Sequence, residues 1–295
     1  YKNSIPLLGI YMCIYIPGGG FFVELVKKKI HLQQNKSKAI LQIPMEEDVN
    51  VSDVNPDVSK IIFNNGKIKI DEIKTGINRI WVKGKLCYKI LYQADEKMTR
   101  LSGMEGEIPF MEEISMEGVE STDRAVCPTK LEDMRVNMIN SRKLNIQSVI
   151  SLMPYVEESV NKEICTELDE NHGGIEYRKR ELPYLEDVVN KRDLFRIHEE
   201  CKLPAGMPNI GNVLWKSANV EHVNFRPLAD KISVNGDILL FIMYEEESGE
   251  KTNWYEVTIP FSGTVECQDS SEAMIPNITY DLGHEEISVR DDADG

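Results

Sequence analysis

The chain has 295 residues, of which 41% are hydrophobic, and a formal net charge of −15 at pH 7. This length suits two domains of about 150 residues, and the apolar content is sufficient for a core in each. An acidic surface argues against nucleic acid as a main partner, because phosphate binding requires a concentrated basic face. The six cysteines are too dispersed for a disulfide framework or a Cys-x-x-Cys site, which favours a reducing compartment.

Residues 5–22 form an uncharged stretch that two prolines and three consecutive glycines interrupt. The stretch reaches the lower length limit of a membrane span, but only short apolar runs remain between the interruptions. It also lacks the basic start of a signal peptide. An internal repeat begins near Val23, so we expect residues 1–22 to be a leader outside the domains, produced by a mis-assigned start. The alternative is an anchor.

Residues 27–43 predict one or two strands, and the polar residues 46–55 predict a turn. Pro56–Phe63 predicts one or two turns of helix, because Asn55 could cap it and proline suits the first helical position. Alternation with a period of two then indicates a series of strands. These strands are expected at residues 67–73, 77–93 and 107–110, followed by a hairpin of residues 131–139 and 144–155.

The strand at residues 77–93 carries the clearest core pattern. Under the two-residue period, six apolar side chains share one face. They are Ile80, Val82, Leu86, Tyr88, Ile90 and Tyr92. Gly84 interrupts this face, which indicates a bulge or a close approach by another backbone. Cys87, in the middle of the strand, is expected to be a buried thiol that packs as a small apolar side chain.

The pattern of residues 56–110 recurs at residues 208–261. Three landmarks recur 152 positions later and one recurs 151 positions later. The pairs are Pro56 with Pro208, Gly84 with Gly236, Tyr92 with Tyr244, and Pro109-Phe110 with Pro260-Phe261. The second copy again predicts a short helix, at residues 208–215, before its strands. A duplication favours a structural or binding module that is used twice over a single catalytic cluster.

The expected fold is mainly β, with two homologous β-sandwich or barrel-like domains that each carry a short helix. We expect a leader at residues 1–22, a first domain at 23–174 and a second domain at 175–295. The acidic residues 157–174 mark the boundary, although they could instead form the last strand of the first unit. Leu144 and Ile146 best match Ile287 and Val289, so the second copy is expected to be incomplete. It would be either a fragment of a longer protein or a naturally shorter domain.

No motif of catalysis or of cofactor binding is found in the sequence. A phosphate-binding loop, a Gly-x-Ser-x-Gly elbow and a His-Glu-x-x-His helix are all missing, and the five histidines lie far apart. We therefore expect a protein that is not an enzyme, without catalytic residues, metal or cofactor.

The two copies differ most on one strand face. Where the first copy has Cys87, Lys89 and Leu91, the second has Leu239, Phe241 and Met243. The second strand is thus apolar on both faces, which predicts either a central strand covered twice or a partner-binding face. Trp254, just before a predicted strand, is the best candidate for an exposed aromatic residue. The candidate partner-binding residues are Leu239, Phe241, Met243 and Trp254.

Three motifs in the same order, found twice, resemble the SPOCS domain. They are Pro-Asp-Val-x-x-Ile-Ile, Val-x-Gly-x-Leu-x-x-x-Ile-Leu-Tyr and Glu-x-Glu-Ile-Pro-Phe in the first copy, with a looser match in the second. This domain occurs in spore-coat morphogenetic proteins of clostridia, the SipL-like and LysM-bearing proteins. The resemblance implies a non-catalytic scaffold of spore-coat assembly, located in the mother-cell cytoplasm at the forespore surface.

The family resemblance further implies a protein partner, a SpoIVA-like coat ATPase. In the family a C-terminal LysM module contributes to this contact, and no LysM-like segment follows residue 270 here. The alternative function is a cell-envelope module that binds carbohydrate or peptidoglycan, in which Trp254 would stack on a sugar ring.

Overall fold

The computed structural model describes residues 2–9, 25–94, 100–168, 178–185, 189–249, 251–283 and 285–290, and all regular structure in these residues is β. In the first half of the chain the strands are β1 (Lys2–Gly9), β2 (Leu25–Lys38), β3 (Leu41–Asn50), β4 (Lys60–Gly76), β5 (Arg79–Gln93), β6 (Leu101–Ser115) and β7 (Ala125–Val126). In the second half they are β8 (Thr129–Asn140), β9 (Lys143–Leu152), β10 (Tyr155–Leu168), β11 (Arg178–Leu185), β12 (Ile210–Leu228), β13 (Lys231–Glu246) and β14 (Thr252–Glu266).

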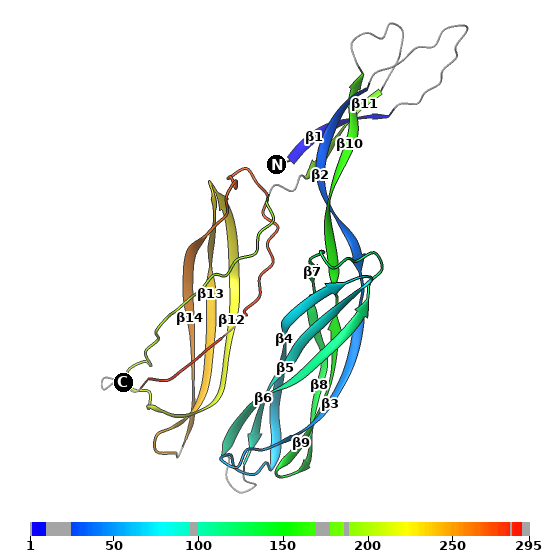
Figure 1. Cartoon of the computed structure of the whole chain (residues 1–295). Coiled ribbons are helices and arrows are strands. Elements are labelled where there is room, and N and C mark those ends of the chain that lie inside the picture. The colour runs from blue at the N-terminus through cyan, green and yellow to red at the C-terminus, as the bar shows by residue number, and fades with distance from the viewer. Residues whose placement is uncertain are drawn as a thin grey trace, which may run out of the picture.

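Domain 1 is a sandwich of two antiparallel sheets, ordered β4-β5-β6 and β3-β9-β8 (Figure 1). Its core lies between the central strands β5 and β9. The six side chains predicted on one face of β5 are all buried, none more than 7% exposed. From β9, the fully buried side chains are Leu144, Ile146, Ile150 and Leu152. The predicted core face is therefore confirmed, as is the predicted hairpin, which β8 and β9 form.

The helices predicted at residues 56–63 and 208–215 are wrong, because β4 begins at Lys60 and β12 at Ile210, and the residues before each strand form no helix. Both strands shift register against the next strand, at Ile62 in β4 and at Leu214 in β12. Such a β-bulge adds one residue to a strand, so apolar residues no longer alternate strictly. In the first copy Val58 is buried before the strand begins, and the bulge follows at Ile62. The apolar residues of this segment are therefore spaced as they would be in one turn of helix.

Gly84 lies opposite a further β-bulge in β4, and Gly236 lies opposite a further β-bulge in β12. The interruption of the apolar face by Gly84 predicted such a bulge. A Cβ atom at Gly84 would lie 2.6 Å from the carbonyl oxygen of Lys69 and 2.8 Å from the ring of Phe110. At Gly236 the same atom would lie 2.8 Å from the ring of Phe261. In both copies glycine therefore leaves room for the phenylalanine that follows the repeated proline.

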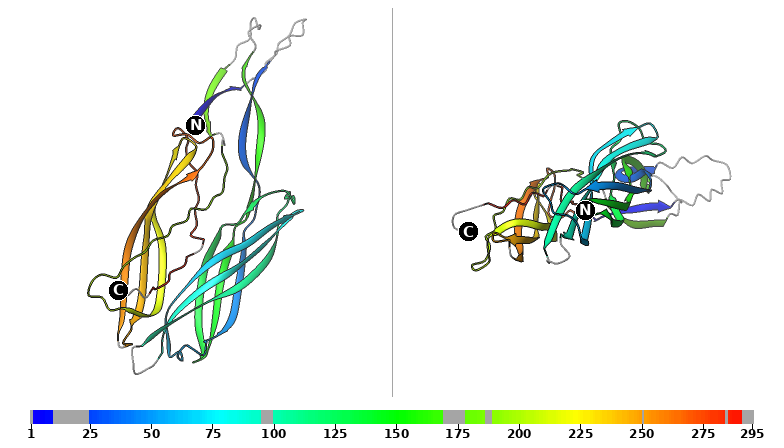
Figure 2. Two further views of the ribbon diagram at one scale, coloured as in Figure 1. Left: turned by 60° about the vertical axis from the view of Figure 1, so that its left-hand side comes forward. Right: turned by 90° about the horizontal axis from the view of Figure 1, so that it is seen from below.

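From residue 189 on, the described residues of domain 2 contain one sheet, ordered β12-β13-β14. Residues 189–209 and 267–290 cross one face of this sheet, and their described parts contain no strand (Figures 1 and 2). The rings of Phe195 and Phe261 contact each other there at 6.0 Å, and those of Phe225 and Tyr280 at 5.8 Å. Domain 2 thus shares the first sheet of domain 1 and differs in the layer above it.

Strands β2 and β10 pair along their length, β7 joins β10 at Tyr155 and Val156, and the rest of the β2–β10 pair extends away from domain 1 as a ribbon (Figure 1). The acidic residues 157–168 thus belong to a strand, which was the alternative prediction for this segment. Strand β1 pairs with β11. The expected start at Val23, most of the expected leader and the expected boundary at residue 174 lie outside the described residues.

Candidate protein-interaction face

The four predicted partner-binding residues lie on one face of the domain 2 sheet, called here the outer face. Leu239, Phe241 and Met243 alternate along β13, and Met243 pairs with Trp254 on β14. The rings of Phe241 and Trp254 stack with centroids 6.3 Å apart and planes 20° apart. Trp254 lies within β14 rather than before a strand. The register between β13 and β14 places it beside Met243 and next to Phe241.

The outer face has an apolar centre and polar sides. The Trp254 side chain is 62% exposed, while the three β13 residues are half-buried. Next to Phe241 on the flanking strands lie Ser217 and Glu256. Strand β13 is hydrogen-bonded to a neighbour on both sides and is therefore the central strand of its sheet. An exposed aromatic residue inside a polar surround is typical of an interaction surface.

The corresponding face of domain 1 contacts domain 2 within the same chain. Leu91 corresponds to Met243 in the repeat. Leu91 pairs with Gly103 on the next strand and Met243 pairs with Trp254, so Gly103 is the counterpart of Trp254. A Cβ atom at Gly103 would overlap the carbonyl oxygen of Leu214 in β12. The Leu91 side chain is 6% exposed. The outer face of domain 1 is therefore shaped to receive the edge of domain 2.

Polar and aromatic contacts stabilise the interface between domain 1 and domain 2. The Lys89 ammonium donates hydrogen bonds to the carbonyl oxygen of Lys216 and to Glu285 Oε1, both at 3.0 Å. The rings of Phe63 and Trp215 meet edge to face at 5.1 Å. In the second copy Phe241 replaces Lys89. The two homologous faces thus have different chemistry, charged and occupied in domain 1, apolar in domain 2.

Two further side chains lie near these faces. Trp215, the last residue of the segment predicted as a helix, lies on the outer face of domain 2, opposite Met243. Its correspondence with Phe63 was visible in the repeat and could have identified an aromatic pair. Cys87 was expected to be buried, but it lies half-buried on the outer face of domain 1, with its Sγ 3.8 Å from Glu107. Partial burial raises the pKa of this thiol, which makes it a weak nucleophile.

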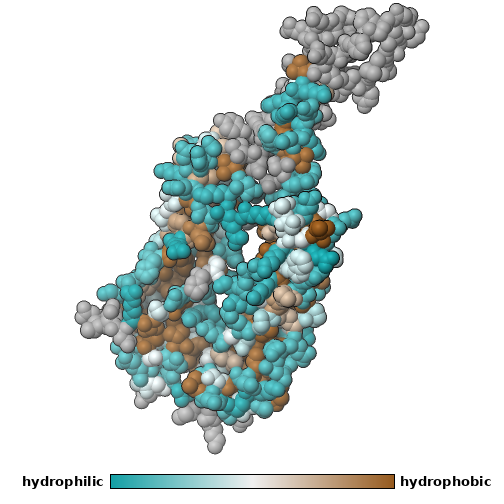
Figure 3. All heavy atoms as spheres, viewed as in Figure 1, coloured by the Kyte–Doolittle hydropathy of each residue, from teal (hydrophilic) through white to brown (hydrophobic). Residues whose placement is uncertain are grey.

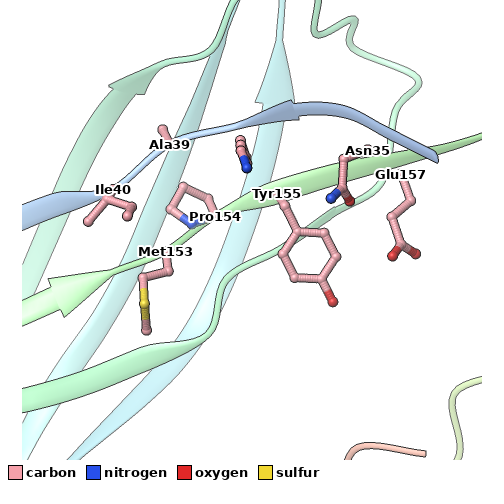
Figure 4. A pocket seen from close by; sticks show the side chains of 8 residues that line it. Asn35, Ala39, Ile40, Met153, Pro154, Tyr155 and Glu157 are labelled. Atoms are coloured by element: carbon pink, nitrogen blue, oxygen red, sulfur yellow. The ribbon is translucent and has the colours of Figure 1, made fainter. Parts of the chain in front are cut away.

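Two hollows lie elsewhere on the surface. One, of about 350 Å³, lies where the ribbon joins domain 1 and is lined by Ile40, Met153 and Tyr155 among others (Figure 4). The other surrounds Arg142, which donates to the carbonyl oxygens of three loop residues, Val51, Ser52 and Asn55. Within the described residues, no three His, Cys, Asp or Glu side chains gather as metal ligands would. The described part of the chain also contains no helix long and apolar enough to cross a membrane.

A family model described as "SipL, SPOCS domain" matches the chain at residues 57–139 and again at residues 209–290. The two matches together cover more than half of the chain, and each begins beside the repeated proline. No curated protein and no solved structure matches the chain.

Proposed function

The chain belongs to the SipL SPOCS-domain family, whose function lies in sporulation, and from this premise we propose a non-catalytic scaffold of spore-coat assembly. The scaffold acts at the forespore surface, in the mother-cell cytoplasm. Its partner is another protein, for which a SpoIVA-like coat ATPase is the first candidate. Binding relies on buried apolar anchors and requires no chemistry.

The observation that carries this proposal is the contrast between the two outer faces. Domain 1 uses its outer face for domain 2, through Gly103 and Lys89. Domain 2 has the stacked Phe241–Trp254 pair at the matching place, with Trp254 62% exposed. Aromatic residues dominate the binding energy of many protein interfaces, because they bury a large area at a small entropic cost. The outer face of domain 2 is therefore the proposed contact with the partner.

The test compares Phe241→Glu with the unchanged chain in binding to a purified SpoIVA-like ATPase, measured by biolayer interferometry. Loss of an aromatic anchor and burial of a charge should weaken binding at least about tenfold. Met111→Glu is the matched control, because Met111 is 71% exposed on β6 of domain 1. This control should bind as the unchanged chain does.

Circular dichroism of both variants separates binding from folding. If Phe241→Glu unfolds domain 2 while the folded fraction still binds normally, Phe241 belongs to the core and the proposal is wrong. Retention of the unchanged chain on insoluble peptidoglycan, lost in Trp254→Ser, would also contradict it and would identify an envelope-binding module instead.

A further inference from the structure

Charged side chains connect the two domains of the chain. In the described residues four ion pairs join domain 1 to domain 2, and three of them have the cation in domain 1. They are Lys67–Asp281, Lys89–Glu285, Arg100–Glu245 and Glu105–Lys216. We propose that these four pairs, called here the clasp, hold domain 2 reversibly against the outer face of domain 1 and release it as the ionic strength rises. This conformational device goes beyond the scaffold function proposed above.

The described residues after β14 supply two of the four acids of the clasp. Part of this segment runs between the two domains (Figures 1 and 2). The Lys67 ammonium, which pairs with the first of these acids, also donates a hydrogen bond to the carbonyl oxygen of Leu282. The Lys89 ammonium bonds Glu285 in the same segment and the carbonyl oxygen of Lys216 on β12. Two lysines of domain 1 thus hold two separate parts of domain 2.

Water reaches most of the clasp, so dissolved salt can screen it. The Lys67 and Asp281 side chains are 51% and 81% exposed. Those of Lys89 and Glu285 are better shielded, at 26% and 30%. An exposed ion pair contributes little to stability and is weakened by salt. The range of its attraction falls from about 10 Å in 0.1 M salt to about 3 Å in 1 M salt. High salt therefore weakens the whole clasp, of which Lys89–Glu285 is the strongest part.

The rest of the interface is narrow. Among the described strands, β6 and β12 make the main contact between the domains. The rings of Phe63 and Trp215 meet edge to face, yet Phe63 remains 53% exposed. Figure 3 shows hydrophilic residues where the upper parts of the two domains face each other. Domains without a large hydrophobic interface move relative to each other. This interface thus depends on its ion pairs to stay closed.

The covalent connection between the domains explains why weak pairs are enough. Two sites in one chain meet at a high effective concentration, so a contact that would not form between separate molecules can be closed within one. Screening of the ion pairs removes the attraction but leaves the connection. The chain therefore closes again when the salt is diluted.

Opening changes the surface that domain 1 presents. It uncovers Leu91 and Gly103, at the place where domain 2 has Met243 and Trp254. It also releases the ammonium group of Lys89 from its two partners. The closed chain thus presents one outer face, the apolar one of domain 2, whereas the open chain also presents the basic one of domain 1.

The test measures the radius of gyration of the whole chain by small-angle scattering in 0.1 M and 1 M sodium chloride. We expect a larger radius in 1 M salt and recovery on dilution. At 0.1 M salt, Lys89→Glu should raise the ratio of open to closed chains about five- to tenfold, because two facing carboxylates replace the strongest pair. Lys85→Glu is the matched control: Lys85 also lies on β5, is 25% exposed, and pairs with Glu107 within domain 1. This control should leave the ratio unchanged.

A charge exchange separates opening from unfolding. Lys89→Glu combined with Glu285→Lys restores an attractive pair and should return the radius at 0.1 M salt to that of the unchanged chain. Circular dichroism should show the same strand content in all variants. The proposal is wrong if 1 M salt leaves the radius unchanged, if Lys85→Glu opens the chain as much as Lys89→Glu does, or if the charge exchange does not restore the compact form.

Discussion

In domain 1 the inner face of β5, opposite the outer face, is buried, with none of its six apolar side chains more than 7% exposed, whereas in domain 2 their counterparts Ile238 and Leu240 are only half-buried. Both domains keep the features that the repeat encodes: the bulged first strand, the glycine beside it and the buried tyrosine. Tyr92 and Tyr244 each donate a hydrogen bond of 3.0 Å to the carbonyl oxygen of the repeated proline. The repeat therefore specifies one sheet with its attached loop, and the second layer depends on residues outside the repeat.

The outer faces differ in a second way. Domain 1 has glycine and lysine where domain 2 has tryptophan and phenylalanine, and only the former combination admits the edge of β12. Trp254 would obstruct the same docking on domain 2. The duplicated units have thus diverged toward different neighbours, which variants made at matched positions can test.

The largest expected difference concerns the inner faces. Leu86→Ala should lower the free energy of unfolding of domain 1 by about 2–5 kcal/mol, because Leu86 is fully buried and would leave a cavity. Ile238→Ala should cost domain 2 only about 1 kcal/mol, since Ile238 is only half-buried. Urea unfolding with hydrogen exchange resolved along the chain measures both. Equal losses would contradict the weaker burial of this face in domain 2.

The next effect concerns the contact between the domains. Gly103→Ala should weaken docking by about 1–3 kcal/mol, because the added methyl group overlaps the β12 backbone. Small-angle scattering should then show a larger radius of gyration. In the control variant Gly283→Ala, the added Cβ atom would meet nothing within 4 Å, so the radius should not change. An unchanged radius in Gly103→Ala would show that the docked arrangement does not depend on this close approach.

A smaller effect should be the same in both domains. Tyr92→Phe and Tyr244→Phe each remove one hydrogen bond and should each cost about 0.5–1.5 kcal/mol. Burial raises the pKa of both hydroxyl groups. Tyr255→Phe is the control, because its hydroxyl bond of 3.3 Å to Lys202 is exposed. Unequal costs for Tyr92 and Tyr244 would show that the second layer of domain 1 contributes to this bond.

The smallest expected effect is on acid stability. Hydrogen bonds from Lys36 and Lys191 hold the pKa of Asp123 and of Asp193 below its ordinary value. This stabilisation is complete above the ordinary pKa of about 3.9 and is lost as the pH falls through the lower pKa of the folded state. The Lys36–Asp123 side chains are 20% and 17% exposed, against 42% and 43% for Lys191–Asp193.

Because the domain 1 pair is better shielded from water, its loss in acid should be the greater one. Unfolding measured from pH 6 to pH 3 should show a steeper decline for the unchanged chain than for Asp123→Asn. The matching variant Asp193→Asn should change the slope less. A steeper effect of Asp193→Asn would contradict the assignment of the stronger pair to domain 1.

Much of the fold was predictable because alternation along strands is a local property. The six core residues of β5 and the β8–β9 hairpin follow from a period of two. The predicted helices failed because a bulge breaks that period and imitates a helical spacing. Cys87 was misplaced because its position in mid-strand does not say which face is covered.

The four candidate residues illustrate the same limit. Alternation predicted that Leu239, Phe241 and Met243 share a face, but only the register between β13 and β14 places Trp254 beside them. The match of Gly103 with Trp254 also needed the strand pairing, because the repeat spacing changes from 152 to 151 before this strand.

The sequence by itself determined the duplication, the β character of both units and the core face of β5. These follow from residue type and spacing, which the sequence contains in full. Only the tertiary structure decided which faces are covered: domain 2 on the outer face of domain 1, and two irregular segments on the inner face of domain 2. Coverage depends on contacts between residues far apart in the chain, and neither alternation nor composition encodes such contacts.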